Sequence, residues 1–303
     1  MLQDFVVLGA NSALPLVDRF SSSFVLRTSN SYFLIDAGEG CQMKLGQFKI
    51  KRSKISHIFI SHLHGDHVFG LPGLITSFNL NNRQDRLTVY GPKGIQKFID
   101  VVLEISQSTL RFELEVKEIS EDSKHEILEQ DGIRISAFPL KHRIPTYGYL
   151  FEEITTTLNV YPSKIHEYRL TIEEIRSAKE GLDVEREGLR IDNEELTYSK
   201  REPVSFAYCS DTVYDPELRN YISGVDLMYH EATYLHELHK EANLRQHSTA
   251  KEAAQVAKIC KAKKLIIGHY SSRYTDLSIL SKEAKSIFPN THLAEEGKIF
   301  TFS

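Results

Sequence analysis

Four titratable side chains stand together directly after an apolar run in the sequence. After "ISHIFI" (55–60) come, within a few positions, His62, His64, Asp66 and His67. Imidazole and carboxylate groups are the ligands that zinc and similar divalent ions prefer. Left buried without a partner, four such groups would cost much free energy, whereas Gly65 permits a tight loop on which they converge. The pattern H-x-H-x-D-H therefore predicts a metal site at the end of a strand.

Three more polar residues each end another apolar run. His142 ends "GIRISAFPLKH", Asp211 ends "VSFAYCSD" and His269 ends "KKLIIGH". Taken singly, each is as compatible with an ordinary polar residue at a strand end as with a metal ligand. Four ligands cannot complete two ions, however, and α/β proteins build their sites at the carboxyl ends of strands. Together, the three residues favour a site for two metal ions.

The elements that must position these residues alternate along the chain. Apolar runs rich in β-branched and aromatic residues predict strands at 4–9, 22–28, 31–38, 55–62, 86–92, 132–140, 204–211, 226–232, 263–270 and 297–303. Helical patterns lie at 39–48, 71–81, 94–106, 214–222, 248–260 and 278–287. An early hairpin followed by strand–helix alternation predicts an α/β fold, an αββα sandwich of two mixed sheets with helices outside.

The stretch 151–203 differs from the rest. Its strand signals fade, and it holds 13 Asp and Glu against eight Lys and Arg. Within it, Ile165, Tyr168, Ile172 and Ile175 fall at helical spacing. We interpret the stretch as a helical arm inserted into the sandwich, with a solvated surface hairpin without function as the alternative.

Composition limits the class of protein. A chain of 303 residues is long enough for one large α/β domain. The net charge of −4 means that any binding of nucleic acid must depend on a local patch. Three scattered cysteines predict a reducing compartment. No signal peptide and no apolar run of about 18 residues is present, so we expect a cytoplasmic protein that does not bind a membrane.

Several motifs carry a family resemblance. "SHLHGDH", preceded by "FLIDAGEG", resembles the metallo-β-lactamase superfamily. "HEATY" (230–234) and "HSTA" (247–250), together with "LGANSALP", "DAGEGCQ" and "SSRY", resemble the motifs of the ribonuclease Z family of tRNA 3′-processing endonucleases. The similarity covers 1–303, which implies a single metallo-β-lactamase-like domain with 151–203 as its inserted arm.

The resemblance implies a role for each ligand of two zinc ions per subunit. One ion would be held by His62, His64 and His142, and the other by Asp66, His67 and His269. Asp211 would bridge the two ions, and Asp36 would orient a ligand histidine from behind.

The resemblance also implies a reaction. Two ions about 3.5–4 Å apart activate a water and clamp the phosphodiester. Asp66 would orient that water, and His247, held by Glu231, would protonate the leaving oxygen. The 3′ trailer of precursor tRNA would be removed, leaving a 3′-hydroxyl on the tRNA.

Substrate binding is where the chain departs from the family pattern. The glycine- and proline-rich segment of the family's tRNA-binding arm is replaced by "RLTIEEIRSAKEGLDV", whose acidic character opposes phosphate binding. In "PLVDRF" (15–20) only Pro15 and Arg19 match the family's P-x-K-x-R-N loop. The substrate-binding hypotheses are Arg19, Arg273 of "SSRY", and a basic helix face made by Lys164, Arg169, Arg176 and Lys179. The family further implies a homodimer, in which one subunit's arm reaches RNA that is cut in the other.

Two other functions are weighed against this one. A phosphodiesterase of the same fold, acting on small phosphodiesters or cyclic nucleotides, is kept in view by the acidic arm. A non-enzymatic RNA-binding subunit would require loss of the metals, against which the intact ligand set argues.

Overall fold

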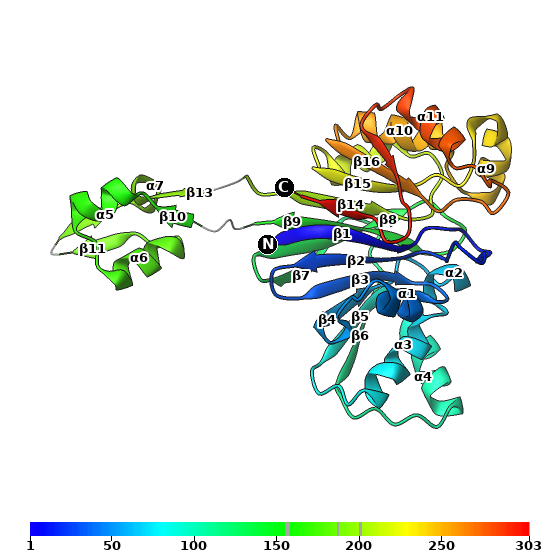
Figure 1. Cartoon of the computed structure of the whole chain (residues 1–303), viewed down its shortest axis with the longest axis horizontal. Helices are drawn as coiled ribbons and strands as arrows, with labels where there is room; N and C mark the ends of the chain where they lie inside the picture. The colour runs from blue at the N-terminus through cyan, green and yellow to red at the C-terminus, as the bar shows by residue number, and fades with distance from the viewer. Residues whose placement is uncertain (155–157, 187, 200–201, 303) are drawn as a thin grey trace.

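The computed structural model describes residues 1–154, 158–186, 188–199 and 202–302. Two seven-stranded sheets pack face to face, and helices cover the outer face of each (Figure 1). The predicted α/β sandwich of two mixed sheets is confirmed.

The first sheet has the order β18-β1-β2-β3-β4-β5-β6. Its strands are β18 (Ile299–Thr301), β1 (Leu2–Gly9), β2 (Ser23–Thr28), β3 (Tyr32–Ala37), β4 (Ile55–Phe59), β5 (Leu87–Pro92) and β6 (Leu114–Ile119). Its connections hold α1 (Cys41–Gln47), η1 (Arg52–Lys54), α2 (Gly65–Val68), α3 (Leu71–Leu80) and α4 (Ile95–Ile105). The predicted hairpin is the antiparallel pair β2–β3, whereas β3 to β6 run parallel.

The second sheet has the order β17-β16-β15-β14-β9-β8-β7. Its strands are β17 (Thr291–Leu293), β16 (Lys264–Gly268), β15 (Leu227–Glu231), β14 (Ser205–Cys209), β9 (Thr146–Glu153), β8 (Ile133–Leu140) and β7 (His125–Gln130). Its helices are η2 (Pro216–Leu218), α8 (Arg219–Ile222), η3 (His236–Leu238), α9 (His239–Arg245), α10 (Ala250–Ile259) and α11 (Ser278–Lys285). Strands β14, β15 and β16 are parallel, and β8 runs in their direction, so all four end at one edge.

Aromatic rings fill the space between the two sheets. Phe59 of the first sheet is fully buried and meets Phe33 and Phe151 edge to face, with ring centroids 5.8 and 5.5 Å apart. Such rings bury much apolar area and prefer this geometry. The core therefore fixes the spacing of the two sheets whose edges carry the predicted ligands.

In the sandwich, the sequence patterns missed β6, β7 and β17 at the sheet margins, and also β9, which lies between β8 and β14. β6 and β7 are edge strands that carry exposed charged residues, and edge strands use such charges to resist further pairing. Their sequences therefore contain no apolar run. β9 continues to Glu153, so the inserted segment begins later than the predicted position 151.

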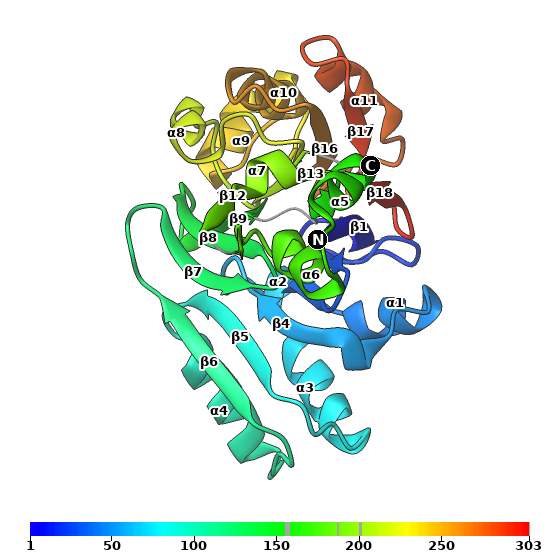
Figure 2. The ribbon, with the colours of Figure 1, turned by 90° about the vertical axis from the view of Figure 1, so that its left-hand side faces the viewer.

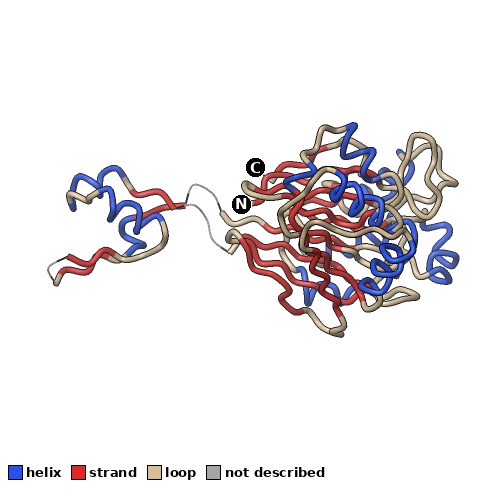
Figure 3. The backbone as a smooth tube through the Cα atoms, turned by 90° about the horizontal axis from the view of Figure 1, so that it is seen from below, coloured by secondary structure: helices blue, strands red, loops and turns tan. Residues whose placement is uncertain are grey.

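Residues 158–199 form a small module, drawn at the left of Figure 1 and in front of the sandwich in Figure 2. It contains β10 (Leu158–Val160), α5 (Pro162–Tyr168), α6 (Ile172–Lys179), β11 (Val184–Arg186), β12 (Leu189–Ile191), α7 (Asn193–Leu196) and β13 (Thr197–Ser199). β10 pairs with β13 and β11 with β12 (Figure 3). The module has an apolar cluster of its own: Val160, Leu170, Ala178, Val184, Ile191 and Leu196.

The prediction of one basic helix face in this module is wrong. Thr171 caps α6, and its hydroxyl and the Glu174 side chain satisfy each other's backbone N–H groups. The helical spacing seen in the sequence therefore crosses a break between two helices. Lys164 lies on α5, whereas Arg176 and Lys179 lie on α6.

Two general features follow from the described residues. None of their helices has the length and apolar character needed to cross a bilayer. Cys41, Cys209 and Cys260 are free thiols buried in the sandwich.

Candidate metal centre

The strand ends bring the seven predicted ligands together. The loop after β4 and the short helix α2 supply four of them, and the ends of β8, β14 and β16 supply one each. Among the described residues, ligand atoms within 4.8 Å of one another form three groups, one of which, Asp211, His247 and His269, overlaps the others. The remaining two groups are His62, His64, His142 and Asp211, and Asp66, His67 and His269. These are the two sets that the family resemblance implied.

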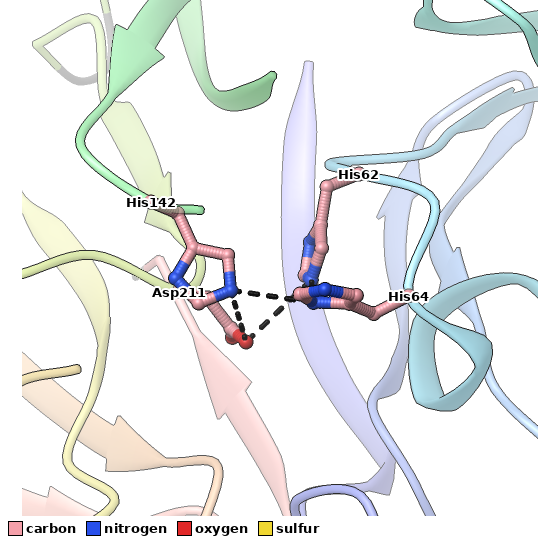
Figure 4. A group of neighbouring side chains, drawn as sticks. All are labelled: His62, His64, His142 and Asp211. Atoms are coloured by element: carbon pink, nitrogen blue, oxygen red, sulfur yellow. Dashed lines mark hydrogen bonds and ion pairs between the residues drawn. The ribbon is translucent and has the colours of Figure 1, made fainter. Parts of the chain in front are cut away.

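In the first group three imidazoles converge (Figure 4). His64 Nδ1 lies 3.0 Å from His62 Nε2 and 3.2 Å from His142 Nε2. His142 donates its Nδ1–H to the carbonyl of Gln246 at 2.8 Å, so its Nε2 carries a lone pair toward the other rings. Asp211 Oδ2 faces His62 Nε2 at 3.5 Å. Converging lone pairs and a carboxylate fit a cation.

The second group has the same chemistry. His269 Nε2 lies 3.3 Å from both Asp66 Oδ2 and His67 Nε2. Asp211 Oδ1 faces His269 Nε2 at 3.3 Å and His67 Nε2 at 3.5 Å, and among the described residues this buried oxygen has no hydrogen-bond donor. Asp211 therefore points one oxygen at each group, and the donor set fits two ions.

Groups behind the ligands hold the imidazoles in place. In four of them the Nδ1 atom faces an oxygen: His62 to Ser61 Oγ at 3.0 Å, His67 to Asp36 at 2.8 Å, His142 to Gln246, and His269 to Thr233 Oγ1 at 2.8 Å. Such contacts fix the ring orientation and leave Nε2 for the metal.

Asp36 lies at the end of β3 in the left-handed backbone region (φ 53°), which is unusual for a residue with a β-carbon. Its carboxylate accepts from the backbone N–H of Ser61 at 2.7 Å, from the Ser61 hydroxyl at 2.9 Å and from the Tyr208 hydroxyl at 2.6 Å, as well as from His67. Tyr208 belongs to the second sheet, so this carboxylate also ties the sheets together.

The electrostatics divide the histidines. Burial lowers the pKa of His62 well below its ordinary value, and burial also lowers the pKa values of His64 and His142, so these rings are neutral as ligation requires. Burial opposes a charge on His67 too, but the carboxylates of Asp211, Asp66 and Asp36 outweigh it and raise its pKa. A bound cation would take the place of that proton.

A second pair of titratable groups adjoins the ligands. His247 Nδ1 lies 2.8 Å from Oε1 of Glu231, the last residue of β15. Burial lowers the pKa of His247, but the charges of Glu231 and Asp211 outweigh it and raise the pKa to about 9. The His247 ring lies 5.1 Å from that of His142 and 5.3 Å from that of His269. A protonated imidazole thus faces both metal groups.

The sequence comparisons agree with this geometry. Ribonuclease Z of Parabacteroides distasonis is 40% identical over 295 residues, which are 97% of this chain and 97% of that protein. Ribonuclease Z of Cytophaga hutchinsonii is 42% identical over 301 residues, 99% of this chain and 96% of that protein. The chain belongs to the ribonuclease Z family. The function predicted from the "HEATY" and "HSTA" motifs is confirmed at this level, that of a metal-dependent endoribonuclease of tRNA 3′ processing.

Structural similarity extends over the same length. The crystal structure of the short form of human tRNase Z matches with a TM-score of 0.73 at 27% identity, over 99% of each chain. A family model described as the anti-Pycsar protein Apyc1 matches residues 3–174. That stretch includes the loop after β4 but ends before Asp211, Glu231 and His247, so it does not cover the features that define the ribonuclease Z site.

A cavity of about 440 Å³ opens over the metal groups of this ribonuclease Z family member. Its lining includes three arginines, Arg143, Arg245 and Arg273. The Arg273 guanidinium lies 4.9 Å from the ring centroid of Tyr234, which itself lies beside His247. The cavity therefore combines the metal groups with cations suited to phosphates.

Sequence reasoning missed several of these lining residues. Arg143 directly follows the ligand His142, and Arg245 lies two residues before His247, but an isolated arginine gives no pattern of its own. Thr233 lies within "HEATY", where its hydroxyl was not considered. The signal that could have identified these three residues is their position within or next to a motif.

The remaining predicted substrate-binding residues lie elsewhere. Arg19 lines a separate cavity of about 250 Å³ with Asn11, Asp18 and Tyr270 among its other walls. Lys164, Arg169, Arg176 and Lys179 lie in the module of residues 158–199. Of the six residues predicted to bind substrate, only Arg273 lines the cavity over the metal groups, within the part of the chain that is described.

Replacing the two carboxylates should separate their contributions to metal binding. Because Asp211 faces both groups and Asp66 faces one, Asp211→Ala should lower the content of both ions, and Asp66→Ala should lower one. Metal analysis of dialysed, zinc-loaded protein measures this, with Asp85→Ala, an exposed aspartate, as the control. Two ions retained by Asp211→Ala would refute the shared position of its carboxylate.

Proposed function

We propose that this chain removes the 3′ trailer from precursor tRNA by hydrolysis of one phosphodiester bond, leaving a 3′-hydroxyl on the tRNA. The observation that carries the proposal is the buried pair His247–Glu231 set against the two metal groups. A hydrolysis of RNA needs a nucleophile at phosphorus and a proton for the leaving oxygen, and this arrangement has a group for each.

Two zinc ions are the proposed cofactors. His62, His64 and His142 would hold one ion, Asp66, His67 and His269 the other, with Asp211 shared between them. Bound there, the pair would lower the pKa of a water toward about 7 and neutralise charge on the phosphate.

The side chains around the ions have separate tasks. Burial raises the pKa of Asp66, but the charge of His67 outweighs it and holds the pKa low. Asp66 is therefore an acceptor at neutral pH and orients the attacking water. His247 is protonated at neutral pH and gives its proton to the departing 3′ oxygen of the tRNA, while Glu231 keeps the ring in place.

Cations at the cavity orient the RNA backbone. Arg143 is exposed and follows His142 directly. Burial is the main cause that lowers the pKa of His64, and the charge of Arg143 lowers it further. Together with Arg273, Arg143 offers guanidinium groups to the phosphates on either side of the cleaved bond. Arg245 also lines the cavity, but its Nε is already paired with Glu241 at 2.6 Å. Arg19, from its separate cavity, would act through the loop 15–20, which its backbone closes by hydrogen bonds with Leu16.

For the inserted module we retain a role in tRNA binding, with a reduced set of residues. Lys164 is already paired with Glu195 at 2.8 Å and with Glu167 at 3.0 Å. Among the described residues, the side chains of Arg169, Arg176 and Lys179 form no ion pair, so these three are the cations free to meet phosphates. We propose the same for the domain division: one sandwich with an inserted tRNA-binding arm.

Assembly and location are proposed from the family resemblance and the composition. A homodimer would let one subunit's module reach RNA bound by its partner, and sedimentation measures this state directly. The buried free thiols support a cytoplasmic location.

The deciding assay uses one precursor tRNA with a 3′ trailer, with and without an encoded CCA. We expect a single cut at the start of the trailer, loss of cleavage in Asp66→Ala, and recovery of chelator-treated protein on addition of zinc. The acidic module favours one alternative, a phosphodiesterase of small substrates or cyclic nucleotides. Turnover of a cyclic nucleotide without any cut in the tRNA would select that alternative.

His247→Ala tests the proton donor through the leaving group. The 3′ oxygen of RNA needs a proton to leave, so we expect a loss of about 10²–10⁴-fold in the rate of tRNA cleavage. A nitrophenolate leaves without a proton, so the rate on bis(p-nitrophenyl) phosphate should fall far less. Zinc content should stay full, and His292→Ala, on the margin strand β17, serves as the control. Equal losses on both substrates would contradict a role in leaving-group protonation.

The combined variant Arg169→Gln, Arg176→Gln, Lys179→Gln tests the module. We expect a higher KM for precursor tRNA, an unchanged kcat and a salt dependence that is weaker by about 0.7–0.9 per lost phosphate contact. Hydrolysis of the small diester should not change. The control Lys49→Gln, Lys51→Gln, Lys54→Gln removes equal charge from exposed residues that precede β4, at the end of the sheet away from the metal groups. A KM for tRNA within experimental error of the parent would exclude the module from binding.

A further inference from the structure

Thr233 lies between the metal groups and the proton-donor pair. It follows β15 by two residues, and its side chain is almost fully buried. Its hydroxyl oxygen lies 2.7 Å from Glu231 Oε2 and 2.8 Å from His269 Nδ1. The same oxygen lies 3.5 Å from His247 Nδ1. No other described side chain forms hydrogen bonds to both Glu231 and a ligand histidine.

The direction of these hydrogen bonds follows from a proton count. A hydroxyl has one proton to donate and two lone pairs to accept with. Both oxygens of Glu231 already accept backbone N–H groups, from Thr212 and Thr233, and Oε1 also faces His247 Nδ1 at 2.8 Å, so Glu231 acts as an acceptor. In line with this, burial opposes ionisation of Glu231, but the charge of His247 outweighs burial and lowers the pKa of Glu231. Thr233 must therefore give its proton to Glu231 and receive the Nδ1–H of His269.

This direction sets the tautomer of a metal ligand. With its proton on Nδ1, His269 has a lone pair on Nε2, the atom that faces Asp66, His67 and Asp211. The ring also comes from a residue in the left-handed backbone region (φ 60°), which is unusual for a residue with a β-carbon. The other ligand histidines whose Nδ1 contacts an oxygen use Ser61, Asp36 or a backbone carbonyl, none of which is bonded to Glu231.

Glu231 is thus connected to two imidazoles. Its Oε1 accepts from His247 Nδ1 at 2.8 Å, and its Oε2 accepts from the hydroxyl that holds His269. Backbone N–H groups of Thr212 and Thr233 donate to its two oxygens at 3.1 and 3.0 Å, so the carboxylate is held from both sides.

We propose that Thr233 is a positioning residue that couples the metal group of His269 to the Glu231–His247 pair. One buried carboxylate then orients the proton donor directly and a metal ligand through Thr233. The inference rests on the proposed function for the roles of His247 and the metals. It predicts that loss of one hydroxyl weakens a metal site and also disturbs proton donation.

The test compares two substitutions that separate the hydroxyl from the methyl group. Thr233→Val keeps the shape and removes the hydroxyl, whereas Thr233→Ser keeps the hydroxyl and removes the methyl. Zinc affinity is measured by competition with a chromogenic chelator, without RNA. We expect Thr233→Val to bind one of two ions about 10–100-fold more weakly, the usual effect of losing a partner behind a ligand. Thr233→Ser should stay within about threefold of the parent.

A second readout uses zinc-saturated protein. The ratio of the rates on precursor tRNA and on bis(p-nitrophenyl) phosphate should fall in Thr233→Val. The reason is that Glu231, which orients His247, loses the hydrogen bond from the Thr233 hydroxyl. The ratio should recover in Thr233→Ser. The matched control is Thr291→Val, a buried threonine of β17 whose hydroxyl bonds a backbone carbonyl. It should change neither readout.

Three results would overturn the proposal. One is zinc affinity and rate ratio in Thr233→Val that both match the parent. Another is equal impairment in Thr233→Ser and Thr233→Val, which would assign the effect to packing of the methyl group. A third is weaker zinc binding in Thr291→Val. If Thr233→Val does not fold, as thermal unfolding would show, Thr233→Ala replaces it in the same comparison with Thr233→Ser. Since the chelator assay contains no RNA, its outcome stands whether or not the parent cleaves precursor tRNA.

Discussion

The carboxylate of Asp211 lies where the two sheets of the sandwich meet, and the site depends on its position. One oxygen faces His62, from the first sheet, and the other faces His67 and His269, one from each sheet. The residue is 2% exposed, and a carboxylate at that depth requires partners in place of its lost hydration. Lone pairs of imidazole cannot serve as such partners, whereas bound cations would. On the proposed function, metal binding would therefore be coupled to correct packing of the two sheets.

Two further carboxylates, at the ends of strands, hold the histidines of the site in place. Asp36, at the end of β3, holds His67 and receives the Tyr208 hydroxyl from the opposite sheet. Glu231, at the end of β15, holds His247 and, through Thr233, His269. On the proposed function, Asp36 would serve structure and metal binding, whereas Glu231 would join metal binding to proton donation. The difference arises because the side chains that Glu231 contacts, His247 and Thr233, line the cavity, whereas those that contact Asp36 do not.

In the inserted module, the composition of the segment does not predict which of its charged side chains are free. Its acidic excess predicted an arm distinct from the sandwich, and the structure gives residues 158–199 their own apolar cluster. The helical spacing of its apolar residues, however, spans two helices, since the capping box of Thr171 and Glu174 starts the second one. Pairing of Lys164 with Glu195 and Glu167 then removes one predicted phosphate ligand. Charge counts along a sequence do not reveal which charges are already neutralised by neighbours.

The sequence by itself determined the metal-binding loop, the strand ends that complete it and the helices and hairpin of the sandwich. These follow from local rules: apolar periodicity, Gly65 in the loop, and polar residues at strand ends. It did not reveal the edge strands β6 and β7, because charged edge strands lack an apolar run. Only the tertiary structure decided that Arg143 and Arg245 line the cavity over the metals and that Thr233 joins Glu231 to His269. These contacts join residues whose separation along the chain, 36 positions for Thr233 and His269, carries no information until the sheets bring them together.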